Sequence, residues 1–170
     1  KLHGARVIGI AGGQQKCDWL TKTCGIDAAI DYKSESVEAK IKELCPDGVD
    51  VFYDNVGGEI LQAAVENMAK LGRILLCGQI SSDDSDRVPE GPRNMMRMVY
   101  GSVTMRGFLA RDFSEQFPEA LANIRRWTEE GKLIHREDLR EGFEQLPETY
   151  LSLFSGSNAG TLLGKIADED

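Results

Sequence analysis

The sequence is poor in the residues that bind metal ions. It has only two histidines, His3 and His135, which lie far apart, and its four cysteines include no C-x-x-C pair. A zinc site draws its ligands from a denser cluster of such side chains. We therefore predict no metal site, and we interpret the four cysteines as free thiols of a protein in a reducing cytoplasm.

Long apolar runs and an excess of positive charge are also missing. No apolar run approaches the roughly 18 residues of a membrane span, and no secretory signal pattern opens the sequence. The net charge of −8 argues against a nucleic-acid partner, because phosphate backbones require a basic patch. A phosphorylated cofactor needs only one or two local cations and is not excluded. The 170 residues, 41% of them apolar, are enough for one domain with its own core.

Strand and helix signals alternate along the sequence, which is typical of a parallel sheet with helical crossovers. Apolar runs predict strands over residues 6–11, 28–31, 49–55, 73–77, 103–109 and 161–166. Helices are predicted over residues 15–24, 36–45, 59–68, 94–100, 117–131 and 142–154, with an extended segment at 133–137 and a long polar loop at 81–92. The fold class is therefore α/β, with a Rossmann-like doubly wound parallel sheet.

The most informative stretch is AGGQQK at residues 11–16, where an apolar strand runs into two glycines and a lysine. The end of the second strand of a nucleotide-binding sheet reads the adenosine ribose: an acidic residue there suits a free 2′-hydroxyl, whereas a cation suits a 2′-phosphate. No acidic residue is present, and the Lys16 ammonium is a point charge within reach. We therefore predict NADP as the cofactor. Because no glycine-rich phosphate loop precedes Ala5, the domain is expected to lack its first strand and pyrophosphate loop.

The same residues have plainer interpretations that the sequence leaves open. Gly12 and Gly13 either let the backbone approach the ribose closely or form an ordinary turn between a strand and a helix. Lys16 is otherwise a solvated lysine near the start of a helix.

Six motifs in a fixed order carry a resemblance to a known family. They are AGGQQK at 11–16, DYK at 31–33, DVFYDNVGG at 50–58, GRILLCGQIS at 72–81, MRGFL at 105–109 and SGSNAG at 155–160. The series covers essentially the whole chain and resembles the zinc-independent medium-chain dehydrogenase/reductases. Among these it is similar to the group of NADPH-dependent alkenal/one reductases that includes prostaglandin reductase, leukotriene B4 dehydrogenase and curcumin reductase.

This resemblance implies an activity and a domain organisation. The expected reaction is the NADPH-dependent reduction of the C=C bond of small α,β-unsaturated ketones or aldehydes, in a protein with a catalytic domain before its cofactor domain. Residues 1–132 then form a partial NADP-binding Rossmann domain, and residues 133–170 a C-terminal segment that packs back on the catalytic domain. Without that domain and the pyrophosphate loop, the chain alone is expected to have little or no activity.

The resemblance also implies a set of cofactor-binding residues. Lys16 and Tyr32 are expected to contact the 2′-phosphate, and the others to line the ribose, the nicotinamide or the cofactor between them. These others are Gly12, Gly13, Asn55, Cys77, Gly78, Ile80, Phe108, Leu109 and Asn158.

Several of these assignments compete with plainer ones. Tyr32 is otherwise a partly buried surface tyrosine, and Asn55 otherwise forms an Asx turn before two glycines. Phe108 and Leu109 are otherwise core residues, and Asn158 otherwise belongs to a flexible glycine-rich turn.

One position departs from the family pattern. Several members carry a tyrosine shortly after the CG-x-I-S segment, credited with hydrogen bonding near the reacting enone, whereas this chain has Asp83 there. An ionised carboxylate cannot donate a proton to a developing enolate and repels it. We therefore assign no catalytic residue.

The missing first strand is the central one of the usual strand order. Its absence leaves the strands at 6–11 and 50–55 with unpaired backbone edges, and buried unpaired groups cost about 1–3 kcal/mol each. We predict that these two strands pair directly, or that a strand from a neighbouring chain enters between them.

Two other functions stay open. One is a non-catalytic assembly module, because the strand from Val103 to Leu109 is expected at the sheet edge, where it pairs across a homodimer axis in the wider superfamily. The other is an NAD(P)-dependent quinone or alcohol oxidoreductase of the same superfamily. Neither a nucleic acid nor a membrane is expected as a partner.

Overall fold

Helices and strands alternate along the computed structural model, which describes residues 1–82 and 91–167. The strands are β1 (Ile8–Ala11), β2 (Ala28–Asp31), β3 (Val49–Asp54), β4 (Met68–Leu76), β5 (Thr104–Gly107), β6 (Glu137–Glu141) and β7 (Thr161–Lys165). The α-helices are α1 (Gln14–Asp18), α2 (Val37–Leu44), α3 (Gly58–Glu66), α4 (Met96–Gly101), α5 (Phe117–Glu129) and α6 (Leu146–Ser155). The predicted α/β class is thereby confirmed.

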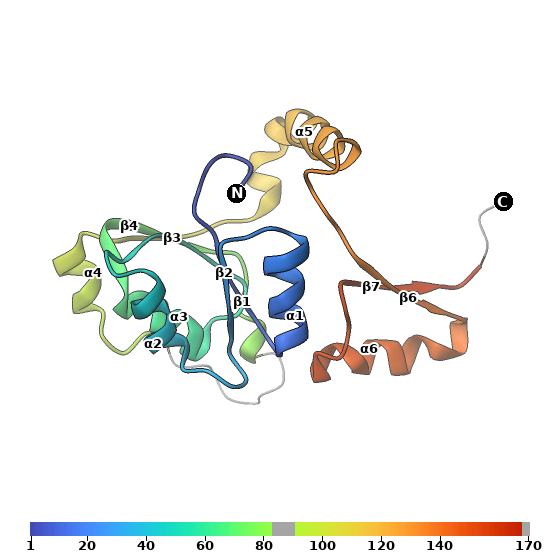
Figure 1. Cartoon of the computed structure of the whole chain (residues 1–170), viewed down its shortest axis with the longest axis horizontal. Coiled ribbons are helices and arrows are strands. Elements are labelled where there is room, and N and C mark those ends of the chain that lie inside the picture. Colours follow the sequence, from blue (N-terminus) through green and yellow to red (C-terminus); the bar gives the residue numbers. More distant parts are fainter. Residues whose placement is uncertain (83–90, 168–170) are drawn as a thin grey trace.

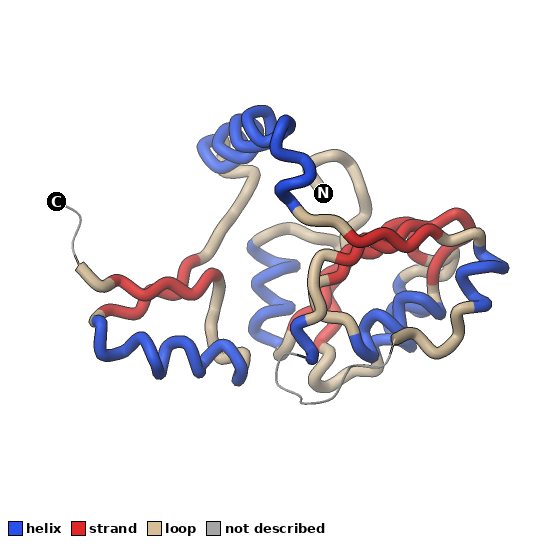
Figure 2. The backbone as a smooth tube through the Cα atoms, turned by 180° about the vertical axis from the view of Figure 1, so that it is seen from behind, coloured by secondary structure: helices blue, strands red, loops and turns tan. Residues whose placement is uncertain are grey.

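The strands form three separate parallel sheets. β1 pairs with β2, β3–β4–β5 form the largest sheet in that order, and β6 pairs with β7. In Figure 1, α1 lies against the β1–β2 pair, and α2 and α3 lie below the three-stranded sheet. Seen from behind in Figure 2, β6, β7 and α6 follow α5 through an extended stretch and form a group to one side of the other elements, which the C-terminal end of α6 approaches at α1.

Local sequence explains where the helices begin and end. The Ser36 hydroxyl accepts a hydrogen bond from the Ala39 N–H at 3.3 Å and so caps α2. A π-helical turn, Trp19–Thr23, continues α1 to Gly25, whose φ of 69° is the left-handed conformation that ends a helix. Pro118 and Pro147 lie in the first turns of α5 and α6, where a missing N–H costs nothing.

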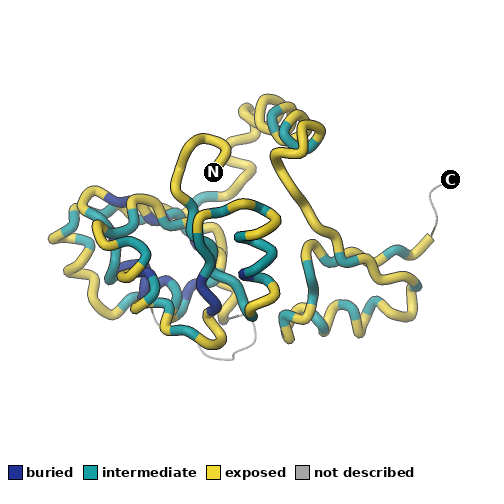
Figure 3. Tube along the Cα trace, in the orientation of Figure 1, coloured by how far each residue is buried: buried dark blue, intermediate teal, exposed yellow. Residues whose placement is uncertain are grey.

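The core consists of two small apolar clusters joined through α3. One contains Leu61, Val65, Met68 and Ile74, and the other contains Ile30, Ile41 and Ala63. The partly buried Val49 packs against both clusters. Within the described ranges no residue after Ile74 is buried, so the stability of the chain depends mainly on its first half (Figure 3).

The expected direct pairing of the strands at 6–11 and 50–55 is wrong. Among the described residues β1 pairs only with β2, and β3 pairs only with β4. Helix packing explains this, because Ile41 of α2 and Ala63 of α3 share one cluster with Ile30 of β2, and Val49 of β3 packs against that cluster. The two helices thereby hold the sheets at a fixed spacing. The entry of a strand from a neighbouring chain stays a prediction.

Two other segments differ from expectation. β4 begins at Met68, well before the predicted residue 73, and contains Leu71 with a left-handed φ of 65°. β6 covers Glu137–Glu141 (EDLRE) and lies mostly beyond the extended segment predicted at 133–137. Its single apolar residue, Leu139, gives no alternating pattern, so the sequence offered no strand signal there.

Candidate cofactor-binding site

The predicted site residues other than Asn158 gather near the carboxyl ends of the first five strands. Parallel pairing brings these ends together, because Ala11 is in register with Asp31 and Leu76 is in register with both Asp54 and Gly107. The residues form two groups, one beyond β1 and β2 and one beyond β3, β4 and β5. Ligands of open α/β sheets bind at this edge.

In the first group, Gly12 lies directly beneath the side chains of Tyr32 and Lys33. A Cβ at Gly12 would be 3.0 Å from Tyr32 Cε1 and Oη, and also 3.0 Å from Lys33 Cε. Tyr32 is 46% exposed, so one face of its ring stays open to solvent. Glycine therefore suits this close packing, because a Cβ there would push the ends of both side chains away by a few tenths of an ångström.

A single carboxylate, that of Asp31, ties the loops after β1 and β2 together. Asp31 Oδ1 accepts hydrogen bonds from the Gly13 N–H at 2.7 Å and the Lys33 N–H at 3.0 Å, and Oδ2 accepts one from the Ser34 hydroxyl at 2.8 Å. These bonds, led by the one from Gly13, lower the pKa of Asp31. Gly13 has a φ of 94°, which suits glycine. The turn interpretation of Gly13 is thus correct for its backbone, and the acid that shapes the turn comes from β2.

Lys16 points from α1 toward the C-terminal end of α6. Its Nζ donates a hydrogen bond to the Gly156 carbonyl at 2.7 Å, and Gly156 ends α6 with a left-handed φ of 62°. A cation is favourable there because the last carbonyls of a helix carry partial negative charge. Lys16 is therefore a fixed group on the β1–β2 side of the molecule, not a freely solvated lysine.

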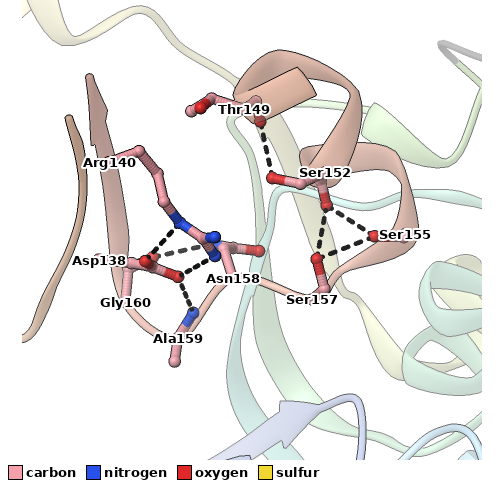
Figure 4. Close-up of polar contacts among 9 residues, drawn as sticks. All are labelled: Asp138, Arg140, Thr149, Ser152, Ser155, Ser157, Asn158, Ala159 and Gly160. Atoms are coloured by element: carbon pink, nitrogen blue, oxygen red, sulfur yellow. Dashed lines mark hydrogen bonds and ion pairs between the residues drawn. The ribbon is translucent and has the colours of Figure 1, made fainter. Parts of the chain in front are cut away.

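The loop that Lys16 contacts is SGSNAG, residues 155–160, and internal hydrogen bonds hold it in place (Figure 4). Asp138 Oδ2 accepts the Ala159 N–H at 3.0 Å, while Oδ1 pairs with Arg140 Nε at 2.9 Å. The bond from Arg140, followed by that from Ala159, lowers the pKa of Asp138. Asn158 Nδ2 donates to the Gly160 carbonyl at 2.8 Å, so its amide nitrogen supports the loop.

In the second group, Asp54 shapes the turn that carries Asn55. The buried Asp54 carboxylate accepts the N–H groups of Val56 at 2.9 Å and Gly57 at 3.0 Å, both through Oδ1. The Asx turn expected at Asn55 is therefore made by its neighbour, and the Asn55 side chain is exposed. The Asn55 carbonyl accepts the Ile80 N–H at 3.1 Å.

The loop after β4 runs alongside this turn. The N–H groups of Cys77 and Gly78 donate to the Asp54 carbonyl at 2.8 and 3.2 Å. A Cβ at Gly78 would lie 3.1 Å from the Asn55 carbonyl oxygen, so glycine allows the two loops to meet. Cys77 and Ile80 have exposed side chains, which leaves them accessible at the sheet edge.

An aromatic cluster of Tyr53, Phe108 and Phe113 borders the second group. The Phe108 ring centroid lies 6.1 Å from that of Tyr53 and 6.0 Å from that of Phe113. A hydrogen bond between the Tyr53 and Cys77 side chains, together with burial, raises the pKa of Tyr53. Leu109 is 51% exposed, so the core interpretation does not hold for it, and its N–H donates to Asp112 Oδ2 at 3.1 Å.

The structure brings most predicted residues together in two groups. The groups are separate because β1 and β3 belong to different sheets and do not pair. Asp83 lies outside the described residues. Within residues 1–82 and 91–167, no three His, Cys, Asp or Glu side chains come together as metal ligands. No helix in these ranges combines the length and apolar character needed to cross a membrane.

Comparison with known proteins decides the family. A family model described as zinc-binding dehydrogenase matches residues 1–126. The chain belongs to this family. The described residues do not fit the zinc ion of that description, because they offer no ligand cluster.

Two curated proteins and one solved structure are similar along the whole chain. The chain is 31% identical to the NADPH-dependent curcumin reductase of Escherichia coli (strain K12), covering 100% of this chain and 51% of that protein. It is 35% identical to the 2-alkenal reductase (NADP(+)-dependent) of Nicotiana tabacum, covering 99% and 49%. The crystal structure of CurA in complex with NADPH from Vibrio vulnificus matches with a TM-score of 0.90 and 33% identity, covering 99% of this chain and 51% of CurA.

These similarities confirm the expected branch, that of the curcumin and alkenal reductases, and the Rossmann-like fold. The chain spans about half the length of the curated relatives it matches.

Sequence reasoning missed four residues that shape the site. Asp31 and Asp54 each end a strand and organise the following turn, and the spacing of Asp31 and Ser34 was a usable signal for such a turn. Lys33 was visible as part of DYK, but nothing placed it over Gly12. The contact between Lys16 and Gly156 joins residues 140 positions apart, and no local pattern predicts it.

Proposed function

We propose that this chain is the cofactor-binding part of an NADPH-dependent reductase that acts on the C=C bond of α,β-unsaturated ketones and aldehydes. The observation that carries the proposal is the group of Lys16, Tyr32 and Gly12 at the ends of β1 and β2. It combines a fixed cation, an accessible phenol and a backbone without a side chain. The curcumin and alkenal reductases that the chain resembles, and the NADPH complex of CurA, support the choice of cofactor and reaction.

In this proposal the first group holds the adenosine end of the cofactor. Lys16 and the Tyr32 hydroxyl bind the 2′-phosphate, while Gly12 and Gly13 admit the ribose close to the backbone. An acidic residue at this place would instead select the free 2′-hydroxyl of NAD. The Asp31 carboxylate does not take that role, because it is only 7% exposed and its oxygens already accept three hydrogen bonds.

The second group is proposed to line the nicotinamide end, with Asn158 reaching in from the SGSNAG loop. Its members are Asn55, Cys77, Gly78, Ile80, Phe108 and Leu109. When bound, NADPH supplies the hydride for the β-carbon of the substrate. The aromatic cluster beside Phe108 offers this end an apolar surface, and the exposed Asn55 side chain offers polar contacts. No residue of the described ranges is assigned as a proton donor.

The preference for NADP⁺ over NAD⁺ tests this proposal. We expect calorimetry on the chain to show tighter binding of NADP⁺, and Lys16→Met to reduce that preference about tenfold, because a charge-assisted contact to the phosphate is lost. Lys42→Met is the matched control, since Lys42 is an exposed lysine of α2 remote from this edge. Equal binding of NADP⁺ and NAD⁺ by the unsubstituted chain would contradict the proposal.

We also infer that the protein forms a homodimer through β5. In the described part of the chain β5 pairs with β4 along one edge only, and a free strand edge readily recruits an identical partner. Sedimentation velocity at increasing concentration is expected to show a dimer. The Phe108 N–H donates to the Leu76 carbonyl of β4, so the N–H of the preceding residue, Gly107, faces the free edge. Gly107→Pro removes that N–H and is expected to shift the protein to the monomer. A strict monomer of the unsubstituted protein at all concentrations speaks against the interface.

The remaining proposals concern location and the C-terminal segment. Four free cysteines support a reducing compartment such as the cytoplasm. Residues 133–170 are proposed to pack on a catalytic domain. The exposed Tyr150, Leu151 and Phe154 of α6 support this, because they offer an apolar surface for such a contact.

A further inference from the structure

We propose that Lys33 is a second cation for the 2′-phosphate of the cofactor and sets the preference for NADP(H) together with Lys16. This inference rests on the proposed function and deepens it. The observation behind it is that both ammonium groups, which come from different loops, lie against the same residue, Gly156.

The backbone of Lys33 is held in a defined position. Its N–H donates to Asp31 Oδ1 at 3.0 Å, and the same oxygen accepts the Gly13 N–H at 2.7 Å. The start of the Lys33 side chain is therefore fixed relative to the glycine turn that precedes Lys16. This shared acceptor ties the two lysine-bearing loops to each other.

The side chain of Lys33 follows the surface of that turn. Its Cε would be 3.0 Å from a Cβ at Gly12, and its Nζ would be 4.0 Å from a Cβ at Gly156. Lys16 Nζ lies 2.7 Å from the Gly156 carbonyl oxygen. The two cations thus converge on Gly156, and the Tyr32 ring packs over Gly12 beside the Lys33 side chain.

The charges of these two lysines are not offset by ion pairs. In residues 1–82 and 91–167 no carboxylate lies within ion-pair distance of either ammonium group. The hydrogen bonds from Gly13, Ser34 and the Lys33 N–H, and after them the charge of Lys33, lower the pKa of Asp31, but the Asp31 oxygens are engaged by these two N–H groups and the Ser34 hydroxyl. Two neighbouring cations in a chain with a net charge of −8 form a local site for a doubly charged anion. A phosphate monoester carries about that charge at neutral pH.

The test uses adenosine 2′-monophosphate and adenosine 5′-monophosphate as probes on the 170-residue chain. These ligands differ only in the phosphate position and need no pyrophosphate contacts. Binding is measured by calorimetry and by NMR titration for the unsubstituted chain, Lys33→Met, Lys33→Arg, Lys16→Met and the control Lys42→Met. Circular dichroism verifies that each variant is folded.

We expect the unsubstituted chain to prefer the 2′-phosphate, and Lys33→Met to weaken its binding about fivefold without changing that of the 5′-phosphate. Lys33→Arg should retain most of the affinity, because the charge is kept. Raising the salt concentration should weaken 2′-phosphate binding more in the unsubstituted chain than in Lys33→Met, since one screened contact is already gone.

The outcomes separate this inference from the proposed function. If Lys16→Met removes the preference while Lys33→Met behaves like Lys42→Met, the role of Lys33 is wrong and the proposed function stands. If the unsubstituted chain shows no preference for the 2′-phosphate, both are wrong.

Discussion

Ile74→Ala is expected to lower the free energy of unfolding by about 3–4 kcal/mol. Ile74 is fully buried in the middle strand of the largest sheet, in register with Phe52 of β3 and Met105 of β5. Truncation removes apolar area and leaves a cavity between the sheet and α3. A domain is stable by only about 5–15 kcal/mol, so this loss is a large fraction of the total.

Urea denaturation followed by circular dichroism measures this effect. Ile166→Ala is the matched control, because it makes the same chemical change at a position that is 64% exposed. It is expected to cost less than about 1 kcal/mol. Equal destabilisation by the two variants would show that the cluster around Ile74 is not the core of the chain.

Asp31→Asn is expected to weaken 2′-phosphate binding about 30-fold and to lower the melting temperature by several degrees. The amide keeps the size of the side chain but loses the charge that three donors share. Its nitrogen cannot accept the Ser34 or Lys33 bond. The loops after β1 and β2 then separate, and Gly12, Tyr32 and Lys33 lose their common arrangement.

The pH dependence of stability provides a second readout for Asp31. Its pKa is lowered in the folded state, chiefly by the Gly13 N–H, below the unfolded value of about 3.9. The contribution of the carboxylate is therefore fully present above the unfolded pKa and is lost as the pH falls through the folded pKa. The difference in melting temperature between the unsubstituted chain and Asp31→Asn should be constant near neutral pH and shrink below pH values of about 4.

Asp18→Asn is the control for this experiment. Asp18 also has a lowered pKa, chiefly through its bond from Lys22, but it lies on the surface of α1. Its replacement should leave 2′-phosphate binding unchanged. If Asp18→Asn lost as much binding as Asp31→Asn, the affinity for the 2′-phosphate would depend on negative charge in general and not on the link between the two loops.

Much of the local structure could be predicted because it depends on neighbouring residues. The strand Ala28–Asp31 was predicted with its observed bounds, and the caps observed at Ser36 and Gly25 use residue types that favour these positions. β6 could not be predicted, because its charged sequence has no apolar alternation and becomes a strand through parallel pairing with β7. Backbone pairing does not depend on side-chain pattern, so such a strand is visible only when its partner is in place.

The candidate site, too, was predictable in part. The ordered motifs indicated which residues end the strands, and parallel pairing placed them at one edge, as with Gly12, Lys16 and Tyr32. The motifs contained no information on contacts between distant loops. Lys16 meets Gly156, and Lys33 approaches it too, because α6 and its loop come close to α1.

The sequence by itself therefore determined the alternating α/β order, the family resemblance and the glycine–lysine motif, all of which rest on short-range patterns. Only the tertiary structure decided that β1 and β3 stay apart, since the spacing of the sheets is set by the packing of α2 and α3 around Ile41 and Ala63. It also decided which charges converge on Gly156. Packing of this kind depends on how whole elements fit together, and no local pattern encodes it.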